Sequence, residues 1–140
     1  FGVLDQAGVD AEAARWVKDL RIATPDPDNA VNTLSGGNQQ RIVLAKWLAT
    51  KPKVLILNGP TVGVDIGSKH DIHRILRELA AEGPAVIIIS DDISEVIQNC
   101  NRVMVMNAGR IVAELDPAVT TDSELADLMS KDTSSFDGKA

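Results

Sequence analysis

The chain has 140 residues, of which 44% are hydrophobic, 24% charged and 3% aromatic. This length allows one compact domain with a hydrophobic core, and the hydrophobic share excludes an intrinsically disordered chain. The 14 Lys and Arg residues against 20 Asp and Glu residues give a net charge of −6. Such a chain is a poor candidate for binding nucleic acid, because it has few cations for phosphates and few rings for bases.

Residues 1–50 carry patterns of helices and no pattern of a strand. Apolar positions at helical spacing predict a helix over residues 10–22, and the prolines within residues 24–29 end it. A second helix is predicted over residues 38–49, after the turn-forming sequence Ser-Gly-Gly at residues 35–37.

From residue 54 onward, strands and helices alternate. Aliphatic runs at residues 54–57 and 86–89 predict two strands buried on both faces, with a helix over residues 67–82 between them. Asp92 and Glu95 form a capping-box pattern that opens a short helix. The remaining elements are predicted as strands at 103–106 and 110–113 around a short turn, a helix at 123–129 and a polar tail at 133–140. The alternation predicts an α/β fold with a largely parallel sheet and flanking helices.

The most informative stretch is the sequence Ser35-Gly36-Gly37 at the head of the second helix. Two glycines let a ligand approach the backbone closely, and a helix N-terminus offers free N–H groups and a positive dipole end. This combination suits a phosphate. For these three residues alone, an ordinary serine N-cap beside a glycine loop is the simpler interpretation.

The longer string Leu-Ser-Gly-Gly-Asn-Gln-Gln-Arg at residues 34–41 resembles the signature motif of ATP-binding-cassette (ABC) ATPases. Its Asn-Gln-Gln part is similar to carbohydrate importers of the ribose type. Further motifs follow in the order of that family: a Walker-B-like strand at 54–57, Pro-Thr at 60–61, a D-loop-like Gly-Val-Asp at 63–65 and a switch-loop-like Ser-Asp-Asp at 90–92. The resemblance covers residues 9–129.

The resemblance implies a P-loop NTPase-like fold that is preceded by part of a helical subdomain. On this basis residues 1–50 are the end of the helical signature subdomain, residues 51–130 are the C-terminal part of the ATPase core, and residues 131–140 are a polar tail. The P-loop itself, Gly-x-x-x-x-Gly-Lys-Ser/Thr, lies upstream of the signature in the family and does not occur in these residues. The chain therefore resembles the back half of a cassette.

Two departures from the family pattern affect the expected chemistry. Where the family's Walker B strand ends in Asp-Glu, this chain has Asn58 and Gly59. A neutral Asn is a weak partner for Mg²⁺, and Gly cannot act as a general base. An Asn-Gly hairpin turn is the alternative interpretation, which Pro60 disfavours. Asp91 stands where many relatives have a histidine, and its carboxylate would repel phosphate.

Several other residues are best interpreted as structural rather than functional. His70 and His73 lie three apart on a predicted helix, but no third ligand accompanies them, so an exposed helix face is favoured over a metal site. We expect Trp47 to be a packing anchor, and Met104 and Met106 to lie in the core.

The resemblance implies part of the ATP-binding subunit of an ABC importer for a carbohydrate or a related small solute. The signature residues Ser35, Gly36, Gly37 and Gln39 would contact ATP, with its Mg²⁺, that is held by a partner cassette. Asp65 of the D-loop would mediate communication across the interface. With the Walker B positions degenerate, little or no hydrolysis and no bound nucleotide are expected of these residues alone.

Membrane-spanning permease subunits would be the further partners, and the place of action would be the cytoplasmic face of the membrane. The lone Cys100 fits a reducing compartment, and the first residues lack the zones of a secretory signal. One alternative is a non-catalytic interaction module that keeps the cassette fold and its dimerisation surface but binds no nucleotide. A relative in DNA repair or translation is disfavoured by the acidic balance.

Overall fold

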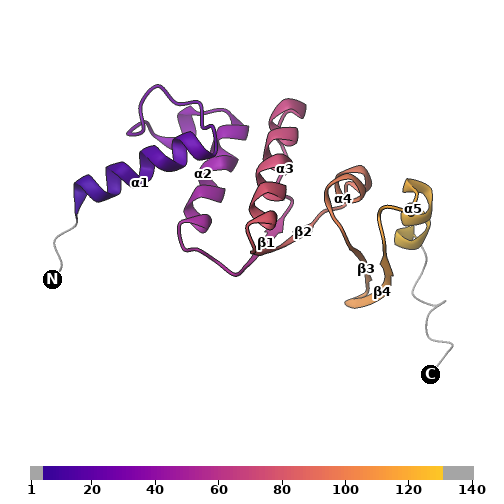
Figure 1. Ribbon diagram of the computed structural model, residues 1–140. Helices are drawn as coiled ribbons and strands as arrows, with labels where there is room; N and C mark the ends of the chain where they lie inside the picture. Colours follow the sequence, from indigo (N-terminus) through magenta and orange to yellow (C-terminus); the bar gives the residue numbers. More distant parts are fainter. Residues whose placement is uncertain (1–4, 131–140) are drawn as a thin grey trace. The chain divides into compact units, whose positions relative to one another are not determined.

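The computed structural model of the chain describes residues 5–130. Its described residues divide into two compact units, one made of residues 5–55 and 60–87 and the other of residues 56–59 and 88–130. Figure 1 follows the elements in chain order, with helices before residue 54 and alternating strands and helices after it. The predicted α/β succession is thereby confirmed, while the predicted tail at 133–140 lies outside the described residues.

The first helix, α1 (Gln6–Asp19), begins earlier than residue 10, where the apolar pattern placed its start. The reason is the N-cap Asp5, whose carboxylate accepts a hydrogen bond from the Gly8 N–H at 3.2 Å. No residue of α1 is buried, and burial begins only after the helix, at Leu20 and Ile22.

The second helix, α2 (Gly36–Leu48), follows the short 3₁₀ helix η1 (Val31–Thr33). Its N-cap is Ser35, so the two glycines predicted to lie in a turn are in fact its first two residues. The residues of α2 that are buried recur along one face of the helix, as expected for an amphipathic helix, and are Gly37, Arg41, Leu44 and Leu48.

Trp47 does not act as the packing anchor that the sequence predicted. It lies beside this buried face of α2, and 53% of it is exposed. The core positions of this part of the helix are filled by Leu44, which is fully buried, and by Leu48. Spacing alone could not distinguish the edge of the apolar stripe from its centre.

The third helix, α3 (Ile66–Ala81), begins at the N-cap Asp65. The predicted apolar stripe is confirmed, with Ile72, Ile75 and Leu76 buried. His73 is buried beside them, so the expectation of an exposed histidine pair is wrong for His73 and right only for His70. His73 lies one turn before Leu76 and therefore shares the face that α3 turns to the core. Within residues 5–130 no group of three metal-ligating side chains occurs.

Strands β1 (Val54–Asn58) and β2 (Ala85–Ile89) pair with each other. The Ala85 N–H donates to the Lys53 carbonyl at 2.9 Å, and the Gly59 N–H donates to the Ile89 carbonyl at 2.8 Å, so the two strands run parallel. The expectation that both faces are buried is wrong. Alternate residues of each strand are exposed, because only one face of the pair is covered within the described residues.

The second unit is built on a hairpin of β3 (Val103–Asn107) and β4 (Arg110–Leu115). The strands are antiparallel and are joined by a turn at Ala108 and Gly109, both with positive φ, which is the short turn that the sequence predicted. The register shifts between Val105 and Met106, which marks a β-bulge.

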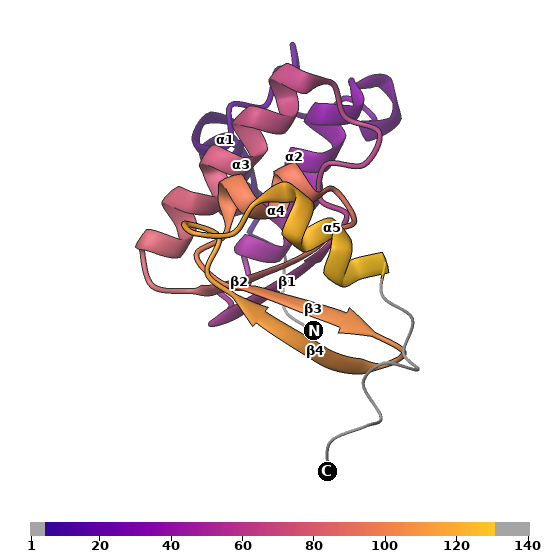
Figure 2. The ribbon, with the colours of Figure 1, turned by 90° about the vertical axis from the view of Figure 1, so that its right-hand side faces the viewer.

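Helices α4 (Ile93–Asn99) and α5 (Asp122–Ser130) cover one face of this hairpin, as Figure 2 shows. The core of the unit contains Val103 and Val105 from β3 and Leu125 from α5. Met104 and Met106, expected in the core, are 44% and 68% exposed. In a strand, neighbouring residues point to opposite faces, and the two valines occupy the covered face. None of the helices within residues 5–130 combines the length and the apolar character needed to cross a membrane.

Because Leu44 is fully buried in α2, its truncation to alanine leaves a cavity as well as removing apolar contacts. We expect Leu44→Ala to lower the free energy of unfolding by about 3 kcal/mol in urea denaturation followed by circular dichroism. Val43→Ala, at the neighbouring and 45% exposed position, is the matched control. It should change stability by no more than about 0.5 kcal/mol. Equal losses in the two variants would contradict this assignment of the core.

Candidate functional site

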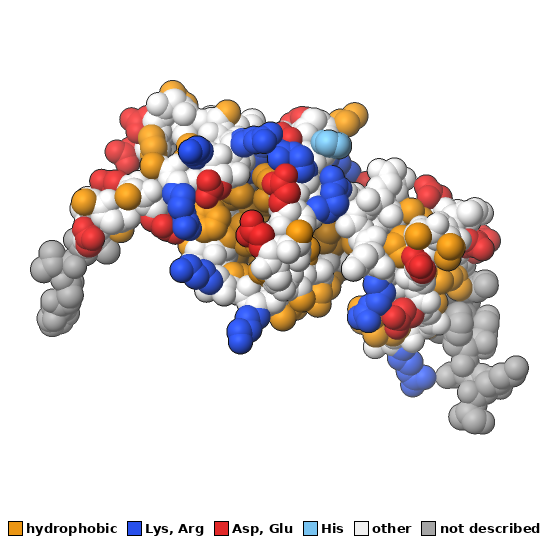
Figure 3. Space-filling model, viewed as in Figure 1, with side chains coloured by type: hydrophobic (Ala, Val, Ile, Leu, Met, Phe, Trp, Pro, Cys, Tyr) orange, Lys and Arg blue, Asp and Glu red, His pale blue; other side chains and the backbone are white. Residues whose placement is uncertain are grey.

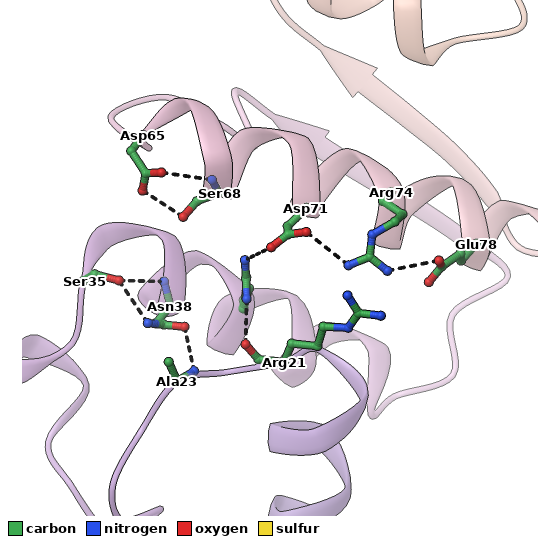
Figure 4. A network of polar contacts seen from close by, with 10 residues as sticks. Arg21, Ala23, Ser35, Asn38, Asp65, Ser68, Asp71, Arg74 and Glu78 are labelled. Carbon is green, nitrogen blue, oxygen red and sulfur yellow. Dashed lines mark hydrogen bonds and ion pairs between the residues drawn. The ribbon is translucent and has the colours of Figure 1, made fainter.

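Ser35 is exposed at the start of α2, where the motif placed it. Its Oγ accepts a hydrogen bond from the Asn38 side-chain amide at 3.0 Å and, at 3.5 Å, from the Asn38 backbone N–H. A serine hydroxyl that accepts these bonds keeps its own hydrogen for donation. Ser35 can therefore offer a hydrogen bond to an anion that approaches the start of α2 (Figure 4).

The Asn38 side chain ties Ser35 to the segment that follows α1. Its Oδ1 accepts a hydrogen bond from the Ala23 N–H at 2.9 Å, while its amide nitrogen donates to Ser35. Figure 4 shows these bonds in a row. Asn38 thus holds the serine hydroxyl in one place relative to the backbone of the first unit.

The other signature residues differ in exposure. Gly36 is exposed, whereas Gly37 is buried. The Gln39 side-chain amide donates to the Leu34 carbonyl at 2.7 Å, so it stabilises the backbone just before α2. The exposed groups that can meet a phosphate are therefore the Ser35 hydroxyl and the backbone at Gly36. The predicted contacts of all four signature residues with ATP stay predictions.

Asp65 lies close to the signature within the same unit. Its carboxylate accepts hydrogen bonds from the Ser68 N–H at 3.0 Å and the Ser68 hydroxyl at 2.8 Å, which begins α3. These bonds hold the pKa of Asp65 below its usual value. Near it, the Gly63 carbonyl lies 3.4 Å from where a Cβ of Gly36 would be. The structure thus brings the D-loop-like segment next to the signature residues.

Asn58, Gly59 and Asp91 gather at the carboxyl ends of β1 and β2, in the second unit. The bond from the Gly59 N–H to the Ile89 carbonyl joins the two strand ends, and both Asn58 and Asp91 are exposed there. β1 pairs with β2 and not with the segment after Gly59, so the alternative of an Asn-Gly hairpin is wrong. Asp92 caps α4, as the sequence predicted, by accepting from the Glu95 N–H at 3.1 Å.

This second set of residues does not suit catalysis by Mg²⁺ and a general base. Asn58 provides a neutral amide, and Gly59 has no side chain and a φ of 57°. A residue with a side chain would be strained in that left-handed conformation by roughly 1–2 kcal/mol. The backbone at Gly59 is therefore adapted to glycine, and the described residues at these strand ends do not fit a metal-dependent hydrolytic site.

An open groove of about 690 Å³ lies between α1, the segment at 24–34 and α2. Its lining is mostly apolar, and hydrophobic side chains are visible in the hollow beside α1 in Figure 3. Such a lining does not suit the phosphates of a nucleotide. The groove is therefore separate in character from the N-terminal end of α2, where Ser35 is exposed.

Sequence reasoning missed the residues that fix α2 against α3. Arg41 donates from Nη2 to the Asp71 carboxylate at 2.8 Å, and Ser68 faces Gly37. The partners are some thirty positions apart, so no periodic pattern connects them. The only local signal was the glycine pair itself, which indicates that something approaches the backbone closely.

Comparison with known families places these motifs in context. The profile of the family described as "ABC transporter" matches residues 4–62. The ribose import ATP-binding protein RbsA 2 of Streptomyces avermitilis is 44% identical over 124 residues, which cover 89% of this chain and 25% of that protein. A putative ribose/galactose/methyl galactoside import ATP-binding protein of Agrobacterium fabrum is 53% identical over 98 residues, covering 70% of this chain and 20% of that protein. The chain thus spans about a quarter of the length of these relatives.

Solved structures agree with the sequence comparison. CbiO1 of Clostridium perfringens, part of an ABC transporter complex, is 31% identical with a TM-score of 0.69, over 82% of this chain and 46% of that one. The ATP-binding cassette MJ1267 of an ABC transporter is 25% identical with a TM-score of 0.73, over 93% of this chain and 49% of that one. The solved structures confirm the P-loop NTPase-like fold, and the curated relatives confirm the resemblance to importers of the ribose type. The chain belongs to the ABC ATPase family.

Proposed function

We propose that the chain is part of the ATP-binding subunit of an ABC importer for a carbohydrate or a related small solute. In this role it supplies signature residues to ATP that is held by a partner cassette. The names of the relatives, ribose and galactose import ATP-binding proteins, support the substrate class. The observation that carries the proposal is the exposed Ser35 hydroxyl, held by Asn38 at the N-terminus of α2.

The chemistry of Ser35 fits the γ-phosphate of ATP. A phosphate oxygen is a strong acceptor, and the helix N-terminus adds a positive field to the hydrogen bond from the hydroxyl. Gly36 presents only backbone at the same end of the helix, which leaves room for the phosphate. When bound, ATP with its Mg²⁺ supplies the phosphoanhydride whose hydrolysis drives transport. The residues of this chain bind and orient its outermost phosphate.

The chain's own catalytic positions contribute little to hydrolysis in this proposal. Asn58 and Gly59 provide neither the carboxylate for Mg²⁺ nor the general base, and Asp91 adds negative charge where phosphate would lie. The two ATP sites of the assembly are then unequal: one is completed by this chain's signature, and the other is impaired by its degenerate Walker B end. Asp65, ionised and fixed by Ser68, lies at the interface with the partner cassette.

The further partners in this proposal are permease subunits, which place the chain at the cytoplasmic face of the membrane. The second candidate is a non-catalytic interaction module that binds no nucleotide, and the same degenerate positions Asn58, Gly59 and Asp91 favour it. The two candidates differ in a thermal-shift measurement with Mg-ATP on the assembled protein and on its Ser35→Arg variant. A ligand that binds only the folded state raises its stability, so a signature that meets ATP makes the shift smaller in the Ser35→Arg variant, whereas an interaction module leaves the shift unchanged.

Ser35→Arg in the complete transporter should abolish ATP-driven solute uptake into vesicles. The bulky side chain would fill the space for the phosphate and remove the hydroxyl that Asn38 positions. Ser130→Arg is the matched control, since Ser130 is exposed at the other end of the described chain, on the last turn of α5. That variant should transport normally. Unchanged uptake by Ser35→Arg would contradict the proposed function.

The paired change Asn58→Asp and Gly59→Glu restores the family's two carboxylates at the end of β1. We expect it to leave the ATPase rate of the transporter close to that of the unchanged protein. The backbone at residue 59 has a positive φ that disfavours glutamate, and Asp91 remains beside it. Steady-state ATPase assays measure the effect, with Asn58→Asp alone for comparison. A several-fold rise in rate would show that the missing carboxylates alone limit this site.

A further inference from the structure

We propose that α3 positions the signature of this chain: Ser68 and Asp71 hold α2 at two points, and Gly37 lacks a side chain because of Ser68. This inference rests on the proposed function, in which the signature meets the ATP of a partner cassette. Both contacts lie within the first unit. They make Ser68 and Asp71 positioning residues, which act on the nucleotide only through the signature.

The first point of contact is between Gly37 and Ser68. Gly37 is buried, and a Cβ at this position would lie 2.6 Å from the Ser68 Cβ and closer still to its Oγ. Real side chains do not approach so closely, so α2 and α3 would have to move apart. The Ser68 side chain is itself fixed, because its hydroxyl donates to Asp65 at 2.8 Å. Ser68, which donates to the N-cap Asp65 of α3, therefore also sets the distance to the start of α2.

The backbone of Gly37 provides an independent argument. Gly37 is helical and is not among the residues with positive φ, so its conformation does not require glycine. In a helix, alanine is more favourable than glycine by roughly 1 kcal/mol. Glycine at this position is explained by the space that Ser68 occupies, without invoking a nucleotide.

The second point of contact is the ion pair between Arg41 and Asp71. Arg41 lies one turn after Gly37 on α2, and Asp71 lies one turn after Ser68 on α3, so the two contacts follow the same pair of helix faces. The Arg41 side chain is only 9% exposed, and its Nη2 lies 2.8 Å from the Asp71 Oδ2. Its Nη1 donates to the Arg21 carbonyl at 2.6 Å. A guanidinium this buried holds its partners strongly, because losing one leaves an unmatched charge.

Asp71 is kept ionised for this role. Arg74 donates to its other oxygen at 3.2 Å and also contacts Glu78, as Figure 4 shows. The hydrogen bond from Arg74, together with the charge of Arg41, lowers the pKa of Asp71. The consequence is that the signature, Asp65 and the first turns of α3 form one rigid element. A displacement of the D-loop-like segment would therefore displace the signature with it.

The experiment is a rescue test on the full-length protein assembled with its transporter partners. Gly37→Ala should lower kcat for ATP hydrolysis on the order of a hundredfold, because a shift of about 1 Å in a phosphate-binding group has an effect of that size. The double variant Gly37→Ala with Ser68→Gly removes both Ser68 atoms that would clash and should recover most of the lost rate. Ser68→Ala in place of Ser68→Gly keeps the Cβ and should recover little.

Gly67→Ala is the matched glycine control. It lies in the first turn of the same helix, α3, and a Cβ there meets only the Asp65 Oδ1 at an ordinary 3.4 Å. Its ATPase rate should be unchanged.

The second variant is Asp71→Asn, which should lower kcat and leave KM for ATP unchanged, since Asp71 positions the signature without touching the nucleotide. Glu78→Gln, which removes an exposed ion pair on the same helix, should change neither value. Urea denaturation of every variant separates a displaced signature from a loss of folding.

The outcomes separate this proposal from the proposed function. If the double variant Gly37→Ala with Ser68→Gly stays inactive, the positioning role is overturned, and the glycine at position 37 is then explained by the space that the nucleotide needs. A fully active Gly37→Ala variant overturns it as well. If Gly37→Ala fails to fold, the loss of kcat in Asp71→Asn decides, and an unchanged kcat there overturns the proposal. Ser35→Arg, measured in parallel, fails to affect ATPase only if the proposed function itself is wrong.

Discussion

The arrangement of the first unit depends on one buried cation. The Arg41 guanidinium is held between the Arg21 carbonyl and the Asp71 carboxylate, and only 7% of the residue is exposed. Removing a guanidinium from water is costly unless its hydrogens meet acceptors, so these two partners restrict how α2 can lie against α3. Ser35 stands at the start of the same helix. The ion pair between Arg41 and Asp71 therefore determines where Ser35 lies relative to α3.

The residues that resemble cassette motifs fall into two sets with different chemistry. In the first unit, Ser35 and Asp65 keep the groups that their motifs need, a hydroxyl free to donate and an ionised carboxylate. In the second unit, the strand ends carry Asn58 and Gly59 in place of two carboxylates. In the proposed function, the chain keeps the fold without this hydrolytic chemistry, because packing depends on buried side chains, whereas catalysis depends on a few exposed ones.

Much of the secondary structure could be predicted from the sequence, and the errors about burial share one cause. The strands, the short turn at Ala108 and the cap at Asp92 were correctly predicted, because each depends on residues close together in the chain. The burial of Trp47 and Met104 was wrongly predicted. Burial depends on which face another element covers, and hydrophobic character alone does not determine that. The candidate signature residues were found from their motif, but not the contacts that hold them.

By itself, the sequence determined the family, the order of the elements and the chemistry available at each motif. These properties follow from residue types and short spacings, such as serine and two glycines at the head of a helix. Only the tertiary structure decided that Gly37 faces Ser68 and that Arg41 pairs with Asp71. The physical reason is separation: the partners lie on different helices, and packing alone brings them within reach of one another.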